Sequence, residues 1–228
     1  MSLKQSVIEM LNMQAELNNA TNGPDWRSGH TQLGKVIDWK RCIYMETAEL
    51  IDSYPWKHWK AVDAPTDIEN VKVELVDIWH FLLSLGLEQF DEATVSKQLT
   101  QYVSDYQNGQ AEYNLRVVDQ VKIHEKLMFM ALQKEPMTQV KFEKLARAFF
   151  DSCGVVSLTF DELYQIYMAK NVLNKFRQDH GYKEGSYIKL WNGKEDNVVM
   201  FEIIAKIEDF SGEKLYSQLE EAYTKVKK

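Results

Sequence analysis

The chain has 228 residues, of which 45% are hydrophobic and 27% charged, a composition typical of a soluble globular protein with a substantial buried core. A formal net charge of −7 argues against a surface that coats nucleic acid. Two widely separated cysteines, no run of about 18 apolar residues and no charged-then-apolar leader lead us to expect a cytoplasmic protein without a membrane or nucleic-acid partner.

The first segment of the chain predicts two helices. Ser2 and Gln5 form a capping box that opens a helix running to about Asn19. A second helix is expected over roughly residues 36–53, because the residue before Pro55 avoids helical geometry. An aromatic loop should follow this proline.

The third predicted helix is apolar almost all round. Thr66 and Glu69 have the spacing of a second capping box, and the helix is expected to end near Gly86. A helix without a polar face is typically central and buried. We therefore place it in the middle of the fold.

Residues 91–152 predict three further helices, interrupted near residues 108–109 and 135–136. We predict no catalytic or binding residues in this stretch, because its charged residues are expected to lie on solvent-exposed helix faces. It is expected to be a helical sub-domain or an insertion at a dimer interface.

The last part of the chain begins with Thr159 and Glu162, which should cap a long helix. An irregular stretch over residues 181–197 follows, with a turn at residues 192–193, and two helices finish the chain. No segment alternates with the period of a strand. We predict one all-α catalytic domain, a multi-helix bundle over residues 1–228.

Two acidic pairs stand out on consecutive helices. Glu46 and Glu49 lie three residues apart on the second helix, and Glu74 and Asp77 repeat this spacing on the third. Residues three apart share a helix face, with Cβ atoms about 5–6 Å apart. All four carboxylates should therefore point into one interior space.

A bound divalent cation would explain carboxylates at such positions. Buried charges are paired or bind a metal, and neighbouring carboxylates repel one another. Oxygen ligands favour Mg²⁺, with Mn²⁺ as a substitute, and such sites suit phosphoryl chemistry. The alternative is that the four acids lie on solvated faces or pair with lysines.

A basic stripe follows on the helix after Thr159 and in the irregular stretch behind it. Such groups could contact triphosphate oxygens that a metal does not reach. The alternative is that these basic residues only stabilise the C-terminal end of the helix through its dipole and bind no phosphate. The candidate residues are Lys170, Arg177, Tyr182, Lys183, Lys189 and Asn197, with Asn174 on the same face.

Several polar and aromatic groups are suited to bind a nucleobase. Gln14 and Asn18 continue the apolar stripe of the first helix, and an amide matches the donor–acceptor edge of a pyrimidine. His80 lies one turn beyond the second acidic pair, and Trp56 and Trp59 could stack. The alternative is that His80 is a core histidine with its hydrogen bonds made inside the protein, and that the two tryptophans only contribute to packing.

The acidic pairs and the basic stripe resemble the all-α NTP pyrophosphohydrolases, which include MazG-like enzymes and dimeric dUTPases. Three stretches are similar to the dimeric dUTPases in particular. The resemblance spans about residues 13–197, and the stretches are residues 44–57, 74–81 and 170–197.

The resemblance implies Mg²⁺-dependent hydrolysis of dUTP to dUMP and pyrophosphate by a homodimer, with dUDP as a second candidate substrate. This reaction would limit uracil in DNA and supply dUMP for dTMP synthesis. The resemblance also assigns Glu46, Glu49, Glu74 and Asp77 as Mg²⁺ ligands, with Glu49 activating the attacking water.

The resemblance also assigns the remaining candidates. The phosphate-binding residues would be Lys170, Arg177, Tyr182, Lys183, Lys189 and Asn197. The residues around uracil and deoxyribose would be Gln14, Asn18, Trp56, Trp59, His80 and Asn174.

Three other functions remain open. A MazG-like enzyme would act on a different nucleoside triphosphate. A di-metal carboxylate bundle needs two Glu-x-x-His motifs, which Asp77-x-x-His80 only approximates. A helical interaction protein would have no catalytic site.

Overall fold

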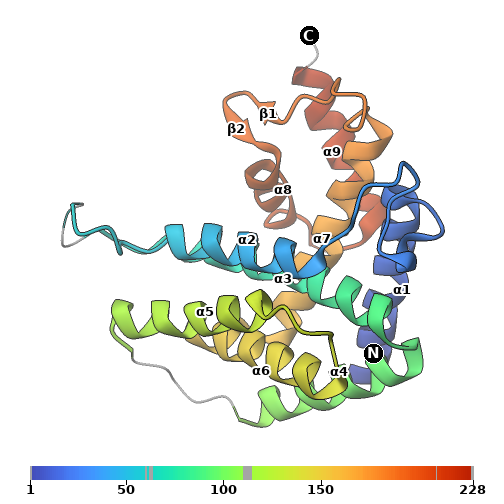
Figure 1. Ribbon diagram of the computed structural model, residues 1–228. Helices are drawn as coiled ribbons and strands as arrows, with labels where there is room; N and C mark the ends of the chain where they lie inside the picture. The colour runs from blue at the N-terminus through green and yellow to red at the C-terminus, as the bar shows by residue number, and fades with distance from the viewer. Residues whose placement is uncertain (1, 60, 62–63, 110–114, 209, 227–228) are drawn as a thin grey trace. The chain divides into compact units, whose positions relative to one another are not determined.

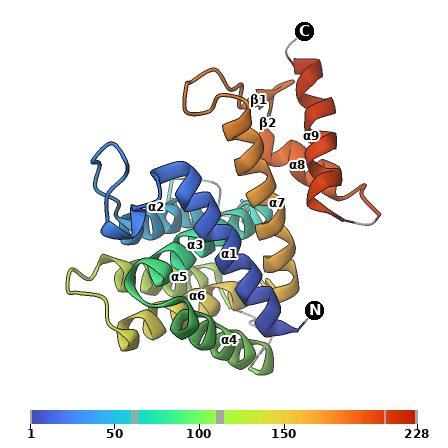
Figure 2. The same ribbon diagram turned by 90° about the vertical axis from the view of Figure 1, so that its right-hand side faces the viewer.

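The computed structural model describes residues 2–59, 61, 64–109, 115–208 and 210–226 (Figures 1 and 2). Helices make up most of these residues, so the predicted all-α class is confirmed. Within this described part, no helix is long and apolar enough to cross a membrane. The chain forms two compact units, Met1–Tyr164 and Gln165–Lys228. Whether they act as one catalytic domain stays a prediction.

The first two helices differ in how well their starts were predicted. Helix α1 spans Leu3–Asn22, and the capping box of Ser2 and Gln5 is present as predicted. Helix α2 spans Trp39–Asp52, so a start near residue 36 is wrong. Asp38 accepts a hydrogen bond from the backbone of Arg41 and caps the helix three residues later than the apolar pattern indicated.

Helix α3, Ile68–Gln89, is the central helix of the first unit. The predicted capping box of Thr66 and Glu69 is wrong, because Asp67 caps the helix through the backbone N–H of Asn70. Gly86 does not end it either. A Cβ atom at Gly86 would lie 3.0 Å from both Phe142 and Val95, so this glycine permits close packing.

The segment predicted as three helices contains α4 (Glu92–Asn108), α5 (Val117–Leu132) and α6 (Gln139–Val155). Helix α3 contacts α1, α2, α4 and α6, while α5 packs on α2 and α6 (Figure 1). Trp79 of α3 stacks on Phe149 of α6 with ring centroids 5.2 Å apart. These helices therefore share the core that holds α2 and α3 together.

Helix α7, Phe160–Asp179, begins in the first unit and continues into the second. Thr159 and Glu162 form the predicted capping box at its start. The expectation of no strands is wrong, because β1 (Leu190–Trp191) and β2 (Lys194–Glu195) pair antiparallel. Asn192 and Gly193 both have positive φ, which suits a two-residue hairpin turn.

The second unit is completed by α8 (Asp196–Ile204) and α9 (Gly212–Val226). Its core is aromatic and aliphatic, and it joins the C-terminal part of α7 to β1, α8 and α9. Its buried members are Ala169, Leu173, Phe176, Trp191, Met200, Leu215, Leu219 and Tyr223.

Candidate functional site

Three acids of α2 and α3 converge in the first unit. Among the described residues, Glu46, Glu74 and Asp77 each offer a carboxylate oxygen, and these oxygens all lie within 4.8 Å of one another. Helix α2 buries Ile43 and Leu50 against its neighbours, which carries Glu46 towards α3. Glu74 is buried, and the other two acids are half-buried. We call these three residues the acidic cluster.

The acidic cluster is electrostatically unfavourable on its own. Burial, followed by the charges of Asp77, Glu49 and Glu74, raises the pKa of Glu46 to about 8. A divalent cation would offset both the desolvation and the repulsion, and three carboxylate oxygens form a ligand set that suits Mg²⁺ or Mn²⁺. The donor chemistry therefore fits a hard cation.

Glu49 lies one turn after Glu46 on α2 but is exposed, and the group within 4.8 Å does not include it. Its charge nevertheless contributes to the raised pKa of Glu46. A carboxylate close to a metal site but open to solvent is suited to accept a proton from water. The geometry thus separates Glu49 from the three converging acids.

A buried polar network joins α1 to α3. The side chains of Gln14, Asn18 and His80, singled out in the sequence, lie together around the hydroxyl of Ser84. Gln14 Oε1 lies 2.7 Å from His80 Nδ1. Sequence reasoning missed Ser84, although a serine one turn beyond His80 on an apolar helix was a detectable signal.

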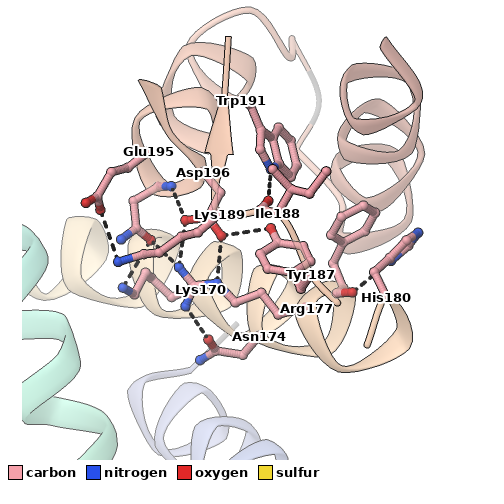
Figure 3. A network of polar contacts seen from close by, with 12 residues as sticks. Lys170, Asn174, Arg177, His180, Tyr187, Ile188, Lys189, Trp191, Glu195 and Asp196 are labelled. Carbon is pink, nitrogen blue, oxygen red and sulfur yellow. Dashed lines mark hydrogen bonds and ion pairs between the residues drawn. The ribbon is translucent and has the colours of Figure 1, made fainter. Parts of the chain in front are cut away.

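The second unit contains a separate polar network (Figure 3). Arg177 donates two hydrogen bonds of 2.8 Å to the carboxylate of Asp196, and the hydroxyl of Tyr187 donates a third of the same length. Asp196 is fully buried. Burial opposes ionisation, but the hydrogen bonds and charge of Arg177 outweigh it, and the pKa of Asp196 is lowered.

Asp196 was not singled out in the sequence, although it lies within the stretch that carried the resemblance. The signal that could have identified it is its position beside Asn197, directly after the hairpin. Because Asp196 binds the guanidinium from one side, it fixes the orientation of Arg177.

Other residues of the predicted basic stripe contact the same network. Lys170 is buried, and its Nζ lies 3.3 Å from Asn197 Oδ1, while Asn174 accepts a hydrogen bond from Arg177 (Figure 3). The ring of Tyr182 lies 6.0 Å from the Arg177 guanidinium. Lys170, Asn174, Arg177 and Asn197 therefore form one connected cluster.

Lys183 and Lys189 are the exposed lysines of the stripe, and the backbone carbonyl of Lys189 accepts a hydrogen bond of 3.0 Å from the backbone N–H of Asp196. Lys189 pairs with Glu195 at 3.3 Å, and both side chains are about half exposed. Lys183 is also exposed. Exposed lysines remain able to meet an anionic ligand, because a surface ion pair contributes little energy.

Trp56 and Trp59 lie in the loop after α2. Their rings meet edge to face, with centroids 6.2 Å apart, and both side chains are largely exposed. Lys57 lies over the Trp56 ring and pairs with Asp52. The loop therefore presents flat aromatic surface to solvent.

The chain was also compared with known proteins. A family model described as dUTPase matches residues 6–182, which include the acidic cluster, the network around Ser84 and all of α7. No curated protein matches the chain.

Proposed function

Because the chain belongs to the all-α dUTPase family and is a dUTP-hydrolysing enzyme, we propose that it converts dUTP to dUMP and pyrophosphate with Mg²⁺ bound at the acidic cluster. The predicted resemblance to this family is confirmed by the match over residues 6–182. The convergence of Glu46, Glu74 and Asp77 is the observation that carries the metal assignment.

The three clustered acids hold Mg²⁺, or Mn²⁺ as a substitute, in this proposal, and Glu49, one turn after Glu46, remains the fourth proposed ligand. When bound, the ion offsets phosphate charge and lowers the pKa of a coordinated water. Glu49 takes a proton from the attacking water, since it is exposed beside the acidic cluster. The water oxygen bonds to the α-phosphorus while the bond to the pyrophosphate oxygen breaks, and no covalent enzyme intermediate forms.

The remaining site residues keep their proposed roles. Charge-assisted hydrogen bonds from lysine, arginine and tyrosine are well suited to phosphate oxygens. The network around Asp196 supports this role, because it holds Arg177 and Lys170 in defined positions. The phosphate-binding residues are Lys170, Arg177, Tyr182, Lys183, Lys189 and Asn197.

The nucleoside half is proposed to contact the polar network of α1 and α3. A buried amide and imidazole cluster provides directional hydrogen bonds that recognise a base or a deoxyribose hydroxyl. The exposed tryptophans of the loop after α2 supply stacking surface. The proposed residues are Gln14, Asn18 and His80 of this network, Trp56 and Trp59 of the loop, and Asn174 of α7.

We further propose that the enzyme is a cytoplasmic homodimer. Exposed apolar side chains occur along α5, where Val118, Phe129 and Leu132 are 51%, 61% and 49% exposed. Exposed apolar residues that gather on one helix support a protein interface. Both cysteines, Cys42 and Cys153, are free thiols, which suits a reducing compartment.

The experiment measures pyrophosphate release from dUTP, dTTP, dCTP and UTP, and phosphate release from dUDP, each with Mg²⁺ and with excess chelator. We expect release from dUTP, little from dTTP and UTP, and none in chelator. Phosphate release from dUDP would identify the second candidate substrate. Preference for another triphosphate would instead indicate a MazG-like specificity.

Two variants test the roles of the acids. Glu49→Gln should still bind dUTP but lose on the order of 10²–10⁴ in kcat, the range that a general base supplies. Glu69→Gln is the matched control, because Glu69 is an exposed acid in the first turn of α3. Turnover by Glu49→Gln equal to that of Glu69→Gln would contradict the role of Glu49.

A further inference from the structure

The hydroxyl of Ser84 is the centre of the buried network between α1 and α3. It donates a hydrogen bond to the backbone carbonyl of His80 at 2.9 Å. Gln14 Nε2 lies 2.9 Å from it, and Asn18 Nδ2 lies 3.0 Å from it. Ser84 is fully buried. One serine oxygen therefore has three hydrogen-bond partners, two of them 66 or more residues away in the sequence.

The single proton of Ser84 determines the direction of these hydrogen bonds. A hydroxyl has one proton and two lone pairs, and a carbonyl oxygen can only accept. The proton must therefore go to the carbonyl of His80, and Ser84 Oγ must accept from both amides. Gln14 and Asn18 are thus required to turn their nitrogens, and not their oxygens, towards Ser84.

The orientation of Gln14 then determines the tautomer of His80. With its nitrogen on Ser84, Gln14 presents Oε1 to His80 Nδ1 at 2.7 Å. An amide oxygen cannot donate, so Nδ1 must carry the ring proton. In the neutral imidazole the other nitrogen, Nε2, then carries a lone pair and acts as an acceptor.

We propose that Ser84 is a positioning residue that makes His80 Nε2 the acceptor for the N3–H group of the uracil ring. This inference rests on the proposed function, in which dUTP is the substrate. Cytosine carries a lone pair at N3, so it would set one lone pair against another and leave a buried acceptor unsatisfied. Ser84 acts through Gln14 and His80, and it selects between bases without touching the substrate.

The tautomer can be measured without any substrate. In protein labelled with ¹⁵N at histidine, long-range ¹H–¹⁵N correlation spectra distinguish protonated from unprotonated ring nitrogens. We expect Nδ1 of His80 to be protonated and Nε2 unprotonated in the wild-type chain. A ring protonated at Nε2, or at both nitrogens, would overturn the proposal.

Ser84→Ala removes the hydroxyl that orients both amides, so Gln14 and Asn18, whose side chains also share a hydrogen bond, can rotate together and the tautomer preference of His80 is weakened. We expect the ratio of kcat/KM for dUTP to that for dCTP to fall about tenfold, mainly through a higher KM for dUTP. Ser84→Thr retains a hydroxyl and should recover most of the ratio.

Ser152→Ala is the matched control. Ser152 is also fully buried on a helix of the first unit, and its hydroxyl has no hydrogen-bond partner among the described residues. Its removal should leave the ratio unchanged. Equal ratios in Ser84→Ala and Ser152→Ala would show that Ser84 only packs, which overturns the proposal.

The identity of the donor is tested by titrating the labelled chain with dUMP and with N3-methyl-dUMP. Only dUMP should shift the Nε2 resonance of His80, because methylation removes the N3 proton. An equal shift with both nucleotides would overturn the N3–H assignment in favour of a deoxyribose hydroxyl. A wild-type chain that hydrolyses no dUTP would contradict the proposed function, whereas a wrong tautomer in an active enzyme would contradict only the role of Ser84.

Discussion

Asp196 illustrates how a single residue determines the position of a functional side chain. Its carboxylate accepts hydrogen bonds from Arg177, from Tyr187 and from the backbone N–H of Asn197. A buried carboxylate is stable only when its lone pairs are satisfied and its charge is paired. Asp196 meets both conditions, so it holds Arg177 in one orientation.

Removing the charge of Asp196 should destabilise the protein. Asp196→Asn leaves the guanidinium of Arg177, whose side chain is only 14% exposed, without its counter-charge. Breaking one side of such a pair typically costs about 3 kcal/mol or more. We expect a loss of this size in the free energy of unfolding, measured by urea titration.

The neighbouring residue provides the control for this prediction. Glu195 pairs with Lys189 at 3.3 Å, but both side chains are about half exposed. Exposed pairs contribute at most about 1 kcal/mol, so Glu195→Gln should change stability very little. Comparable losses in the two variants would show that burial of an ion pair does not determine how much its removal destabilises this protein.

At the scale of helices, His124 joins α5 to the end of α2. Its Nε2 lies 2.9 Å from the hydroxyl of Tyr54, which follows α2, and the two rings are 5.2 Å apart. His124 is fully buried, and this burial lowers its pKa from 6.5 to about 4. Burial therefore favours the neutral ring in the folded protein.

This contact predicts a pH dependence of stability. Below pH 6.5 the unfolded chain binds a proton at His124, whereas the folded chain does not until about pH 4. Stability must therefore fall as the pH falls through this window, and the contribution is constant above it. We expect wild type to lose about 2 kcal/mol more than His124→Gln between pH 7 and pH 5, measured by urea titration at both values.

An exposed histidine serves as the reference for this experiment. His30→Gln alters a largely solvated ring and should follow the wild-type pH dependence. If His124→Gln loses as much stability as wild type between the two pH values, the ring is protonated in the folded chain and the contact with Tyr54 does not depend on its charge.

At the scale of the whole molecule, the acidic cluster links stability to metal. Repulsion among Glu46, Glu74 and Asp77 acts against folding, whereas a ligand that binds only the folded chain stabilises it by mass action. Mg²⁺ at about 100 times its dissociation constant should add about 2.7 kcal/mol.

Asp77→Asn should reduce both the repulsion among the acids and the stabilisation by Mg²⁺. Without Mg²⁺ the variant should melt at a higher temperature than wild type, because one repulsive charge is gone. With Mg²⁺ it should gain much less stability than wild type, as thermal unfolding with and without the metal would show at matched ionic strength. An equal gain in both proteins would place the metal elsewhere.

Most helices were predictable because their signals are local. The capping boxes of α1 and α7, and the proline after α2, act within a few residues of themselves. The start of α3 was missed by one residue, since Thr66 and Asp67 are both good caps and only the folded chain selects between them. The turn at residues 192–193 was predicted, but the two strands beside it were missed because two-residue strands have no detectable period.

By itself, the sequence determined the all-α class, the family and the residue types of the candidate site, because helical periodicity and the spacing of the acidic pairs are properties of neighbouring residues. Only the tertiary structure decided that Glu49 lies outside the acidic cluster, that Ser84 orients the amides of α1, and that Asp196 binds Arg177. These contacts depend on how each element is rotated against its neighbours. That rotation is set by packing among residues far apart in the chain, which no local pattern records.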